Sequence, residues 1–330
     1  MEIASFNKME DLSIPYPRDS SRGLVNESPA MKQALQRALR FAGKEELKIV
    51  LLSGPTGCGK EKLAEAIHHE SPRAKKELIA KNCAEIPPEL RASELFGYPQ
   101  GAFTGASYSR RGYFELAQDS FIFLDEINET DIGFQRMLLR VLQDWKIWPI
   151  GSMRKIDLNI RVIIGSSQDL KEMIESKEFL APLYYRISKI TIKIPPLCQR
   201  IEDIQLLAER FLRKECPDRI IKISPDALSL LKTYPWPGNV RELENEIGRI
   251  VFDYEDIANI QPEHLLEEIR EGVTLKATKK IAVNLERDRI VQALKATHGN
   301  VSRAAKTLDI PRATLQGIID RLEVPDFRQN

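Results

Sequence analysis

KIVLLSGPTGCGKEKLAEAIHH, residues 48–69, is the stretch that decides the fold. It opens with a nearly continuous apolar run, typical of a strand buried on both faces, and it closes with a helical pattern. Between them stands GPTGCGKE, residues 54–61. A strand, then GxxxxGK, then a helix is the context that a phosphate-binding loop requires. The stretch therefore predicts an α/β domain that binds a phosphorylated ligand.

The residue types in this loop fit that chemistry. Glycines let backbone N–H groups curl round a phosphate, the helix N-terminus adds partial positive charge, and Lys60 reaches the terminal phosphates. Glu61 stands where such loops usually carry a Ser or Thr hydroxyl for Mg²⁺, so other groups must hold the metal. The expected nucleotide-binding residues here are Gly54, Pro55, Thr56, Gly57, Cys58, Gly59, Lys60 and Glu61.

A second motif supplies the acidic groups. FIFLDE, residues 121–126, ends a buried strand with Asp125 and Glu126. Four apolar residues directly precede this pair, which disfavours a solvated loop. Adjacent carboxylates at a strand end beside a phosphate loop fit Mg²⁺ coordination by Asp125 and water activation by Glu126. Together the two motifs predict hydrolysis of a nucleoside triphosphate with Mg²⁺, and the family resemblance given below implies that this nucleotide is ATP.

The rest of the chain indicates a parallel sheet followed by helices. IRVIIGSS, residues 160–167, reads as another buried strand, and SPAMKQALQRALRFA as an amphipathic helix with Ser28 as cap and Pro29 in its first turn. Helical patterns between the strands imply parallel order. After IKIPPL, residues 192–197, three candidate helices follow, EDIQLLAERFL, SPDALSLLKTY and NVRELENEIGRIV.

Composition limits the class of protein. The chain has 330 residues, 42% hydrophobic and 29% charged, which suits two or three globular domains. No apolar run approaches the roughly 20 residues that span a bilayer, and no secretory segment opens the chain, so we expect a cytoplasmic protein with no membrane partner. The four cysteines have no CxxC spacing, which indicates reduced thiols rather than disulfides or a zinc site.

The C-terminal region has the form of a helix, a tight turn and a helix. GNVSRAAKTLDIPRATLQGIIDRL spans residues 299–322, and residues 276–330 carry 11 Lys and Arg against 6 Asp and Glu. This pattern predicts a helix-turn-helix whose second helix enters the DNA major groove; the alternative is a helical packing module with solvated polar residues. The candidate DNA contacts are Arg303 and Lys306 for phosphates, and Arg312, Thr314 and Gln316 for bases or phosphates.

GAFTGA, residues 101–106, places an apolar ring and a hydroxyl, Phe103 and Thr104, between two glycines. One interpretation is a packed turn with Phe103 in the core. The other is a mobile loop, between the phosphate loop and the acidic strand in sequence, whose tip docks on a protein partner while the glycines supply backbone freedom.

Taken together, the motifs resemble the AAA+ ATPases, and specifically the bacterial enhancer-binding proteins that activate sigma-54 RNA polymerase. The resemblance runs from Leu24 to the C-terminus and includes the GAFTGA signature. The matching segments are GPTGCGKE, NCAEIPPELRASELFG, GAFTGA, FLDEI, LLRVLQD, LYYRI, PPLCQRIEDI and WPGNVRELEN.

This resemblance implies a fold and a domain order. We expect a P-loop NTPase with a parallel sheet core, a helical lid subdomain and a small all-α Fis-type helix-turn-helix domain. The expected boundaries are a flexible leader at 1–22, the α/β ATPase subdomain at 23–198, the lid at 199–270, a linker at 271–282 and the DNA-binding domain at 283–330. The leader is too short for a sensory domain, so we expect control by a partner, another subunit or expression level.

The resemblance also implies residue roles. Lys60 is the phosphate lysine, Asp125 the magnesium ligand and Glu126 the catalytic carboxylate. Asn82 matches an asparagine that holds this glutamate inactive until the target engages, and Arg241 matches the lid arginine that senses nucleotide phosphates. Arg186 matches an arginine that reaches the neighbouring subunit's ATP, which implies a ring, usually a hexamer, with dimeric pairing on a palindromic enhancer site.

The resemblance further implies that the GAFTGA loop contacts sigma-54. The residues of this loop are Gly101, Ala102, Phe103, Thr104, Gly105 and Ala106. ATP energy would then remodel the closed complex of sigma-54 RNA polymerase.

Two positions depart from the family pattern. Leu180, in FLAPLYYR, replaces a second interface arginine, and Ser167, in GSS, replaces an asparagine that helps to position the γ-phosphate or the attacking water. Serine can still donate one hydrogen bond, so we expect weakened rather than absent hydrolysis. The alternative function is a DNA-binding regulator that binds nucleotide with little or no hydrolysis.

Overall fold

The computed structural model describes residues 27–104, 106–271 and 301. The chain divides into two compact units, which are Met1–Ile220 with Trp236–Asp256, and Ile221–Pro235 with Ile257–Asn330. The domain boundaries expected from the sequence stay a prediction. Within the described residues, no helix combines the length and apolar character needed to cross a membrane.

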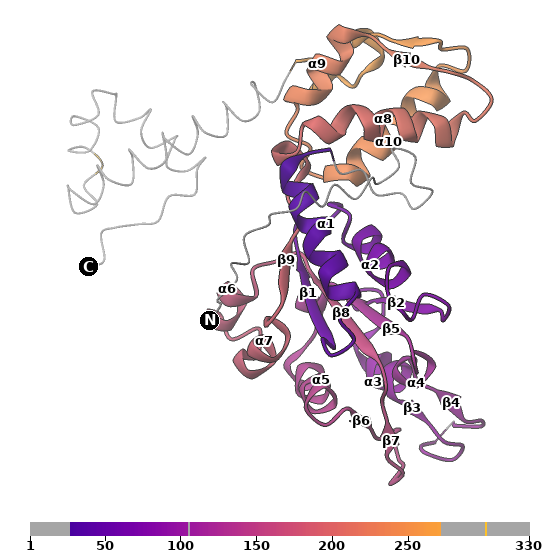
Figure 1. Ribbon diagram of the computed structural model, residues 1–330, viewed down its shortest axis with the longest axis vertical. Coiled ribbons are helices and arrows are strands. Elements are labelled where there is room, and N and C mark those ends of the chain that lie inside the picture. Colours follow the sequence, from indigo (N-terminus) through magenta and orange to yellow (C-terminus); the bar gives the residue numbers. More distant parts are fainter. Residues whose placement is uncertain (1–26, 105, 272–300, 302–330) are drawn as a thin grey trace, which may run out of the picture. The chain divides into compact units, whose positions relative to one another are not determined.

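A five-stranded sheet organises the larger unit (Figure 1). All of its pairings are parallel, and the strand order is β2-β5-β8-β1-β9. The predicted buried strands are present as β1, β5 and β8, and the predicted parallel α/β class is confirmed. The strands are β1 (Ile49–Ser53), β2 (Leu78–Asn82), β5 (Phe121–Asp125), β8 (Arg161–Ser166) and β9 (Thr191–Lys193).

Alternating side chains give this sheet two buried faces, as strand geometry requires. In β1, Val50 and Leu52 pack on one face with α1 and α2, while Leu51 packs on the other with α5 and α7. The helices of this unit are α1 (Pro29–Ala42), α2 (Lys60–His69), α3 (Pro88–Phe96), α4 (Tyr113–Leu116), α5 (Ile132–Asp144), α6 (Leu170–Glu175), α7 (Ala181–Ile187), α8 (Glu202–Glu215) and α10 (Asn239–Asp253). Two short 3₁₀ turns are η1 (Ile127–Glu129) and η2 (Leu197–Gln199).

Helix α1 begins where the sequence indicated. The Ser28 hydroxyl accepts a hydrogen bond from the Met31 N–H, and proline follows in the first turn. Ser28 itself donates from its backbone N–H and its hydroxyl to the buried Asp203 carboxylate, at 2.9 and 3.2 Å. This pair fixes the start of α1 against α8.

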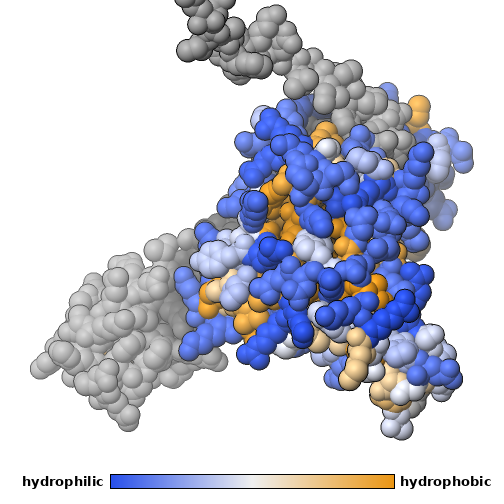
Figure 2. All heavy atoms as spheres, turned by 60° about the horizontal axis from the view of Figure 1, so that its bottom comes forward, coloured by the Kyte–Doolittle hydropathy of each residue, from blue (hydrophilic) through white to orange (hydrophobic). Residues whose placement is uncertain are grey.

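Two small antiparallel hairpins project from the sheet (Figure 1). One pairs β3 (Gly97–Tyr98) with β4 (Arg110–Arg111), and the other pairs β6 (Lys146–Ile147) with β7 (Ile156–Asp157). The Ile150 N–H donates to the Gly97 carbonyl at 2.8 Å, so the two hairpins are joined. Figure 2 shows a surface dominated by hydrophilic residues, with hydrophobic patches between them.

The smaller unit is described by itself. Its elements are α9 (Pro225–Thr233), β10 (Lys222–Ile223), β11 (Asn259–Ile260), η3 (Pro262–His264) and α11 (Glu267–Arg270). The predicted Ser224 cap of α9 is confirmed, since its hydroxyl accepts from the Ala227 N–H. The predicted helices of the helix-turn-helix lie outside the described residues.

Candidate nucleotide-binding site

The carboxyl ends of the parallel strands meet at one edge of the sheet, which is where α/β proteins bind ligands. β1 leads into the phosphate loop, β2 ends at Asn82, β5 ends at Asp125 and β8 leads to Ser167. A cavity of about 410 Å³ opens there. Its lining includes ten predicted site residues, namely Thr56, Gly57, Gly59, Lys60, Glu61, Asn82, Asp125, Glu126, Ser167 and Arg241.

The glycines of the phosphate loop are required by its geometry. Gly57 and Gly59 have φ values of +75° and +102°, in the left-handed region that favours glycine. A Cβ at Gly57 would lie 2.3 Å from the Gly238 carbonyl oxygen. The Val240 N–H donates to the Gly57 carbonyl at 3.0 Å. This close approach of the α10 start brings Arg241 to the cavity.

Three residues of the loop do not line this cavity. Gly54, Pro55 and Cys58 form the base of the turn, and the Cys58 N–H donates to the Pro55 carbonyl at 3.2 Å. The Cys58 thiol is buried, and burial raises its pKa. A thiol held neutral in this way packs as a small apolar group.

Lys60 carries the buried positive charge of the site. Only 4% of its side chain is exposed, and its Nζ lies 3.2 Å from Glu126 Oε1 and 3.9 Å from Asp125 Oδ1. The same ammonium donates to the Gly54 carbonyl at 3.2 Å. A lysine held between the loop backbone and two carboxylates lies where nucleotide phosphates would enter.

Asp125 fits a magnesium ligand. Burial raises its pKa, against the lowering effect of Lys60, so its carboxylate lacks full compensation by positive charge. Its Oδ1 accepts from the Glu126 N–H at 2.9 Å, and glycine at 165 leaves it room, because a Cβ there would lie 2.0 Å from this oxygen. No group of three or more His, Cys, Asp or Glu that could hold a metal occurs among the described residues. Mg²⁺ does not require a group of three such side chains, since one or two carboxylates together with substrate phosphates are sufficient ligands.

Glu126 is held by neighbours other than the predicted one. Its Oε2 accepts from the Ser167 hydroxyl at 2.5 Å, and its Oε1 faces Lys60. Asn82 lies in the same cavity, but its amide donates to Glu85 at 3.0 Å and its carbonyl accepts from the Ala84 N–H at 3.0 Å. In this structure the carboxylate of Glu126 is therefore bound by Lys60 and Ser167.

The GAFTGA segment forms the loop of the β3–β4 hairpin. Gly101 has a φ of +79°, and its N–H donates to the Ala106 carbonyl at 2.9 Å. Phe103 is 46% exposed, with its ring 5.0 Å from that of Tyr98, and Thr104 is also exposed. Ala102 is half-buried beside Gly151 of the other hairpin, and Ala106 is buried. The packed-turn interpretation is wrong for Phe103, which lies outside the core; Gly105 lies outside the described residues.

Comparison with known proteins gives the family. A model of the sigma-54 interaction domain matches residues 24–193, one of the AAA+ ATPase lid domain matches 198–282, and one of the Fis family of bacterial regulatory proteins matches 283–316. The chain belongs to the family of sigma-54-dependent transcriptional regulators. The AAA+ fold and the Fis-type helix-turn-helix expected from the sequence are thereby confirmed.

Relatives in this family include the DNA-binding transcriptional activator HyfR of Escherichia coli K12, 40% identical over 320 residues, with 91% of this chain and 48% of HyfR covered. The transcriptional regulatory protein GlrR of the same strain is 38% identical over 313 residues, covering 93% of this chain and 70% of GlrR. The chain thus spans from about half to about 70% of the length of these curated relatives.

Solved structures of NtrX from Brucella abortus are also similar. The complex with ADP gives a TM-score of 0.69 at 30% identity, covering 92% of this chain and 70% of NtrX. The complex with ATP gives 0.68 at 29% identity, covering 93% and 70%.

Other residues that the family resemblance singled out lie apart from the cavity. Arg186 is exposed on α7, and its guanidinium donates to the Leu142 carbonyl, at 2.9 Å from Nε. Leu180 is half-buried against the core, and its N–H donates to Gln135 Oε1 at 2.8 Å. The predicted DNA contacts Arg303, Lys306, Arg312, Thr314 and Gln316 lie outside the described residues.

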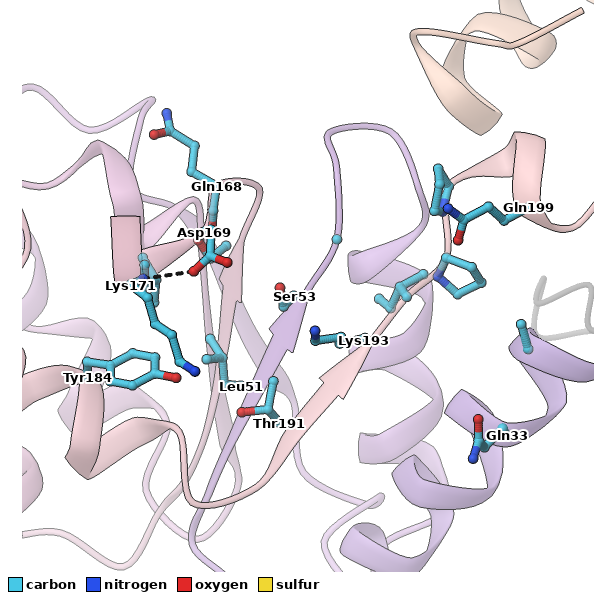
Figure 3. A pocket seen from close by; sticks show the side chains of 17 residues that line it. Gln33, Leu51, Ser53, Gln168, Asp169, Lys171, Tyr184, Thr191, Lys193 and Gln199 are labelled. Carbon is cyan, nitrogen blue, oxygen red and sulfur yellow. Dashed lines mark hydrogen bonds between the residues drawn. The ribbon is translucent and has the colours of Figure 1, made fainter. Parts of the chain in front are cut away.

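A second cavity, of about 560 Å³, lies beside the phosphate loop (Figure 3). Of the predicted site residues described by the structure, Gly54 alone lines it. Lys171 extends toward the Tyr184 ring from α6, and Lys193 lies next to Ser53 on the neighbouring strand. These polar groups come from β1, α6, α7 and β9, and neither Asp125 nor Glu126 lines the cavity, so it is separate from the proposed catalytic groups.

Proposed function

We propose that this sigma-54-dependent regulator is an ATP-driven transcriptional activator. It binds enhancer DNA upstream of a promoter, assembles as a homo-oligomeric ring and remodels the closed complex of sigma-54 RNA polymerase. The observation that carries this proposal is the cavity that gathers Lys60, Asp125 and Glu126 at one edge of the sheet, in the same unit as an exposed GAFTGA loop. We place the protein in the cytoplasm, where polymerase and DNA are found.

In this proposal, each polar residue of the cavity has a separate role in the transfer of the phosphoryl group to water. Lys60 leaves Glu126 for the nucleotide phosphates, and Arg241 contacts those phosphates from α10. Mg²⁺ held by Asp125 would neutralise charge on the phosphate oxygens. With Lys60 withdrawn, Glu126 Oε1 becomes free to accept a proton from the attacking water.

Arg186 acts across the ring in this proposal. It is exposed and lies away from its own cavity, as an arginine that serves a neighbouring subunit must. Leu180 packs against the core, so we assign the trans-acting role to Arg186 alone. ATP hydrolysis should therefore rise more steeply than in proportion to protein concentration, because activity needs assembly. At rest we expect a dimer on a palindromic site, with Arg303, Lys306, Arg312, Thr314 and Gln316 facing the DNA.

The decisive experiment is a promoter-melting assay with sigma-54 polymerase, enhancer DNA and ATP. We expect open complexes with the unaltered protein and none with Lys60→Ala, which should also abolish ATP hydrolysis. DNA binding should persist in this variant and serves as its control. The alternative function, a nucleotide-binding regulator without hydrolysis, is motivated by Leu180 and Ser167. If the unaltered protein binds ATP and DNA but shows neither hydrolysis nor melting at any concentration, the alternative holds.

A further inference from the structure

Asn128 is a buried polar residue two positions after Glu126, and no motif of the sequence singled it out. It lies in η1 with 5% of its surface exposed. Its Oδ1 accepts a hydrogen bond from the Ser167 N–H at 3.2 Å and lies 3.1 Å from the Ser166 hydroxyl, whose single proton is shared with the Gln168 carbonyl at 2.9 Å. Because a backbone N–H can only donate, the carboxamide oxygen must face Ser167. The other end of the carboxamide is therefore the amide nitrogen, Nδ2.

That nitrogen and the Glu126 carboxylate both contact the Ser167 hydroxyl, and the carboxylate can only accept. Asn128 Nδ2 donates to Ser167 Oγ at 3.4 Å and to Glu129 Oε1 at 3.0 Å. A serine hydroxyl has one proton, and here its oxygen already accepts from Nδ2. The proton is therefore directed at Glu126 Oε2, which lies 2.5 Å away. This distance is typical of a hydroxyl that donates to a charged carboxylate.

We propose that Asn128 and Ser167 act as a pair of positioning residues that orient the carboxylate of Glu126. The inference rests on the proposed ATPase function. Oε2 stays bound to Ser167 while Oε1, which faces Lys60, is the oxygen released when Lys60 moves to the phosphates. Asn82 does not perform this task in the structure, since its carboxamide bonds to Glu85 and Ala84. The serine that replaces the family asparagine thus works together with a carboxamide supplied by η1.

A purely structural role for Asn128 gives a different expectation. The residue also links η1 to the end of β8. A link of this kind affects folding stability and has no specific effect on the rate of the chemical step. Two measurements distinguish the two roles. The first compares the change in kcat with the change in KM for each variant, and the second tests whether substitutions at Asn128 and Ser167 have coupled effects. Residues that act as one unit give a double variant no worse than either single variant.

The test measures ATP hydrolysis, affinity for a fluorescent ATP analogue and melting temperature in the full chain. We expect Ser167→Ala and Asn128→Ala each to lower kcat about 10- to 100-fold, as loss of an orienting partner does. KM and analogue affinity should stay within about threefold, and the double variant should match the single variants within about threefold. Ser167→Thr keeps the hydroxyl and should retain kcat within about threefold.

Ser120→Ala is the matched control. It removes another buried serine hydroxyl, which donates to the Glu77 carbonyl at 2.6 Å just before β5, at the opposite edge of the sheet. It should leave kcat within about twofold of the unaltered value. The pairing is overturned if Ser167→Ala keeps full kcat, if the double variant is additive, or if kcat falls only in proportion to melting temperature. An unaltered protein with no hydrolysis overturns the proposed function itself.

Discussion

Arg161 offers a test of how the N-terminal helix is fastened to the sheet. The residue begins β8 and is fully buried, and its guanidinium lies over the rings of Phe41 and Phe121, 4.2 and 4.8 Å from their centroids. It donates to four carbonyl oxygens at the end of α1 and in the loop after it, on Phe41, Ala42, Lys44 and Leu47, at 2.5 to 3.1 Å. The last carbonyls of a helix have no partner within the helix. One side chain therefore caps α1 and ties it to the strand that leads to Ser167.

The magnitude of a substitution follows from which carbonyls remain unsatisfied. In Arg161→Met, the buried carbonyl of Ala42 loses its partner, at about 1–3 kcal/mol, whereas the Phe41 carbonyl keeps the Lys44 N–H at 3.1 Å. The carbonyls of Lys44 and Leu47 are partly exposed and can bind water instead. Burial lowers the pKa of Arg161 to about 10, so removing the charge also relieves a desolvation cost. We expect a net loss of about 1–3 kcal/mol in the free energy of unfolding, and a melting temperature lower by about 2–12 °C.

The assay is urea unfolding followed by circular dichroism, together with ATP-analogue affinity below the melting temperature. Affinity should persist, because Arg161 lies at the amino ends of the strands and the cavity at their carboxyl ends. Arg161→Lys should give an intermediate loss, because one compact ammonium cannot replace the guanidinium fork. Arg140→Met is the control, an exposed arginine stacked on Trp148 at 4.4 Å, with an expected loss below about 1 kcal/mol. If Arg161→Met unfolds within about 0.5 kcal/mol of the unaltered protein, the guanidinium is not the cap.

Three further predictions follow from the site and the core. Thr104→Ala should keep ATP hydrolysis within about twofold but lose open-complex formation, measured by promoter melting, because in the proposed function the exposed tip contacts sigma-54 and not ATP; normal activation by this variant would refute the contact. Chelation of Mg²⁺ by EDTA should abolish hydrolysis measured by phosphate release, and turnover that survives EDTA would exclude Asp125 as a metal ligand. Burial lowers the pKa of His68, whose Nε2 has no hydrogen-bond partner among the residues that the structure describes. The folded state therefore binds this proton less readily than the unfolded state, and stability should fall as pH drops below about 6.5. His68→Gln should flatten that dependence in urea unfolding, the exposed His69→Gln should not, and equal slopes in both variants would contradict the assignment.

The strands that could be predicted are the ones buried on both faces. Strands β1, β5 and β8 lie inside the sheet, where uniform apolar surroundings select runs such as FIFL. β2 lies at an edge and all of its residues are partly or fully exposed, so its sequence, LIAKN, has no strong strand pattern. The two hairpins have strands of two residues each, too short to leave any periodic signal.

The residues of the candidate site also fall into those that the sequence predicts and those that it does not. Lys60, Asp125 and Glu126 stand beside strand and loop signals, and the parallel order of the strands places them at one edge. Asn128 carries no local signal, because its importance depends on a contact with Ser167, 39 positions later in the chain. The partner of Glu126 was predicted as Asn82, and the structure instead pairs the carboxylate with Lys60 and Ser167. Which of several polar side chains contacts a carboxylate depends on backbone geometry that residue types do not specify.

The path from the cavity to the GAFTGA loop is short and is built from helices. After Asn82 the chain continues to α3, which ends at Phe96 directly before β3 (Figure 1). After Glu126 it continues through η1 to α5, which ends one residue before β6. These helices have nine and 13 residues, or about 13 and 20 Å at 1.5 Å per residue. The hydrogen bond from Ile150 to Gly97 joins the loop of the second hairpin to the start of β3. Because packed helices move as rigid elements, we expect a displacement of Glu126 on nucleotide binding to reach the loop through α5 and the second hairpin, even if Asn82 stays in place.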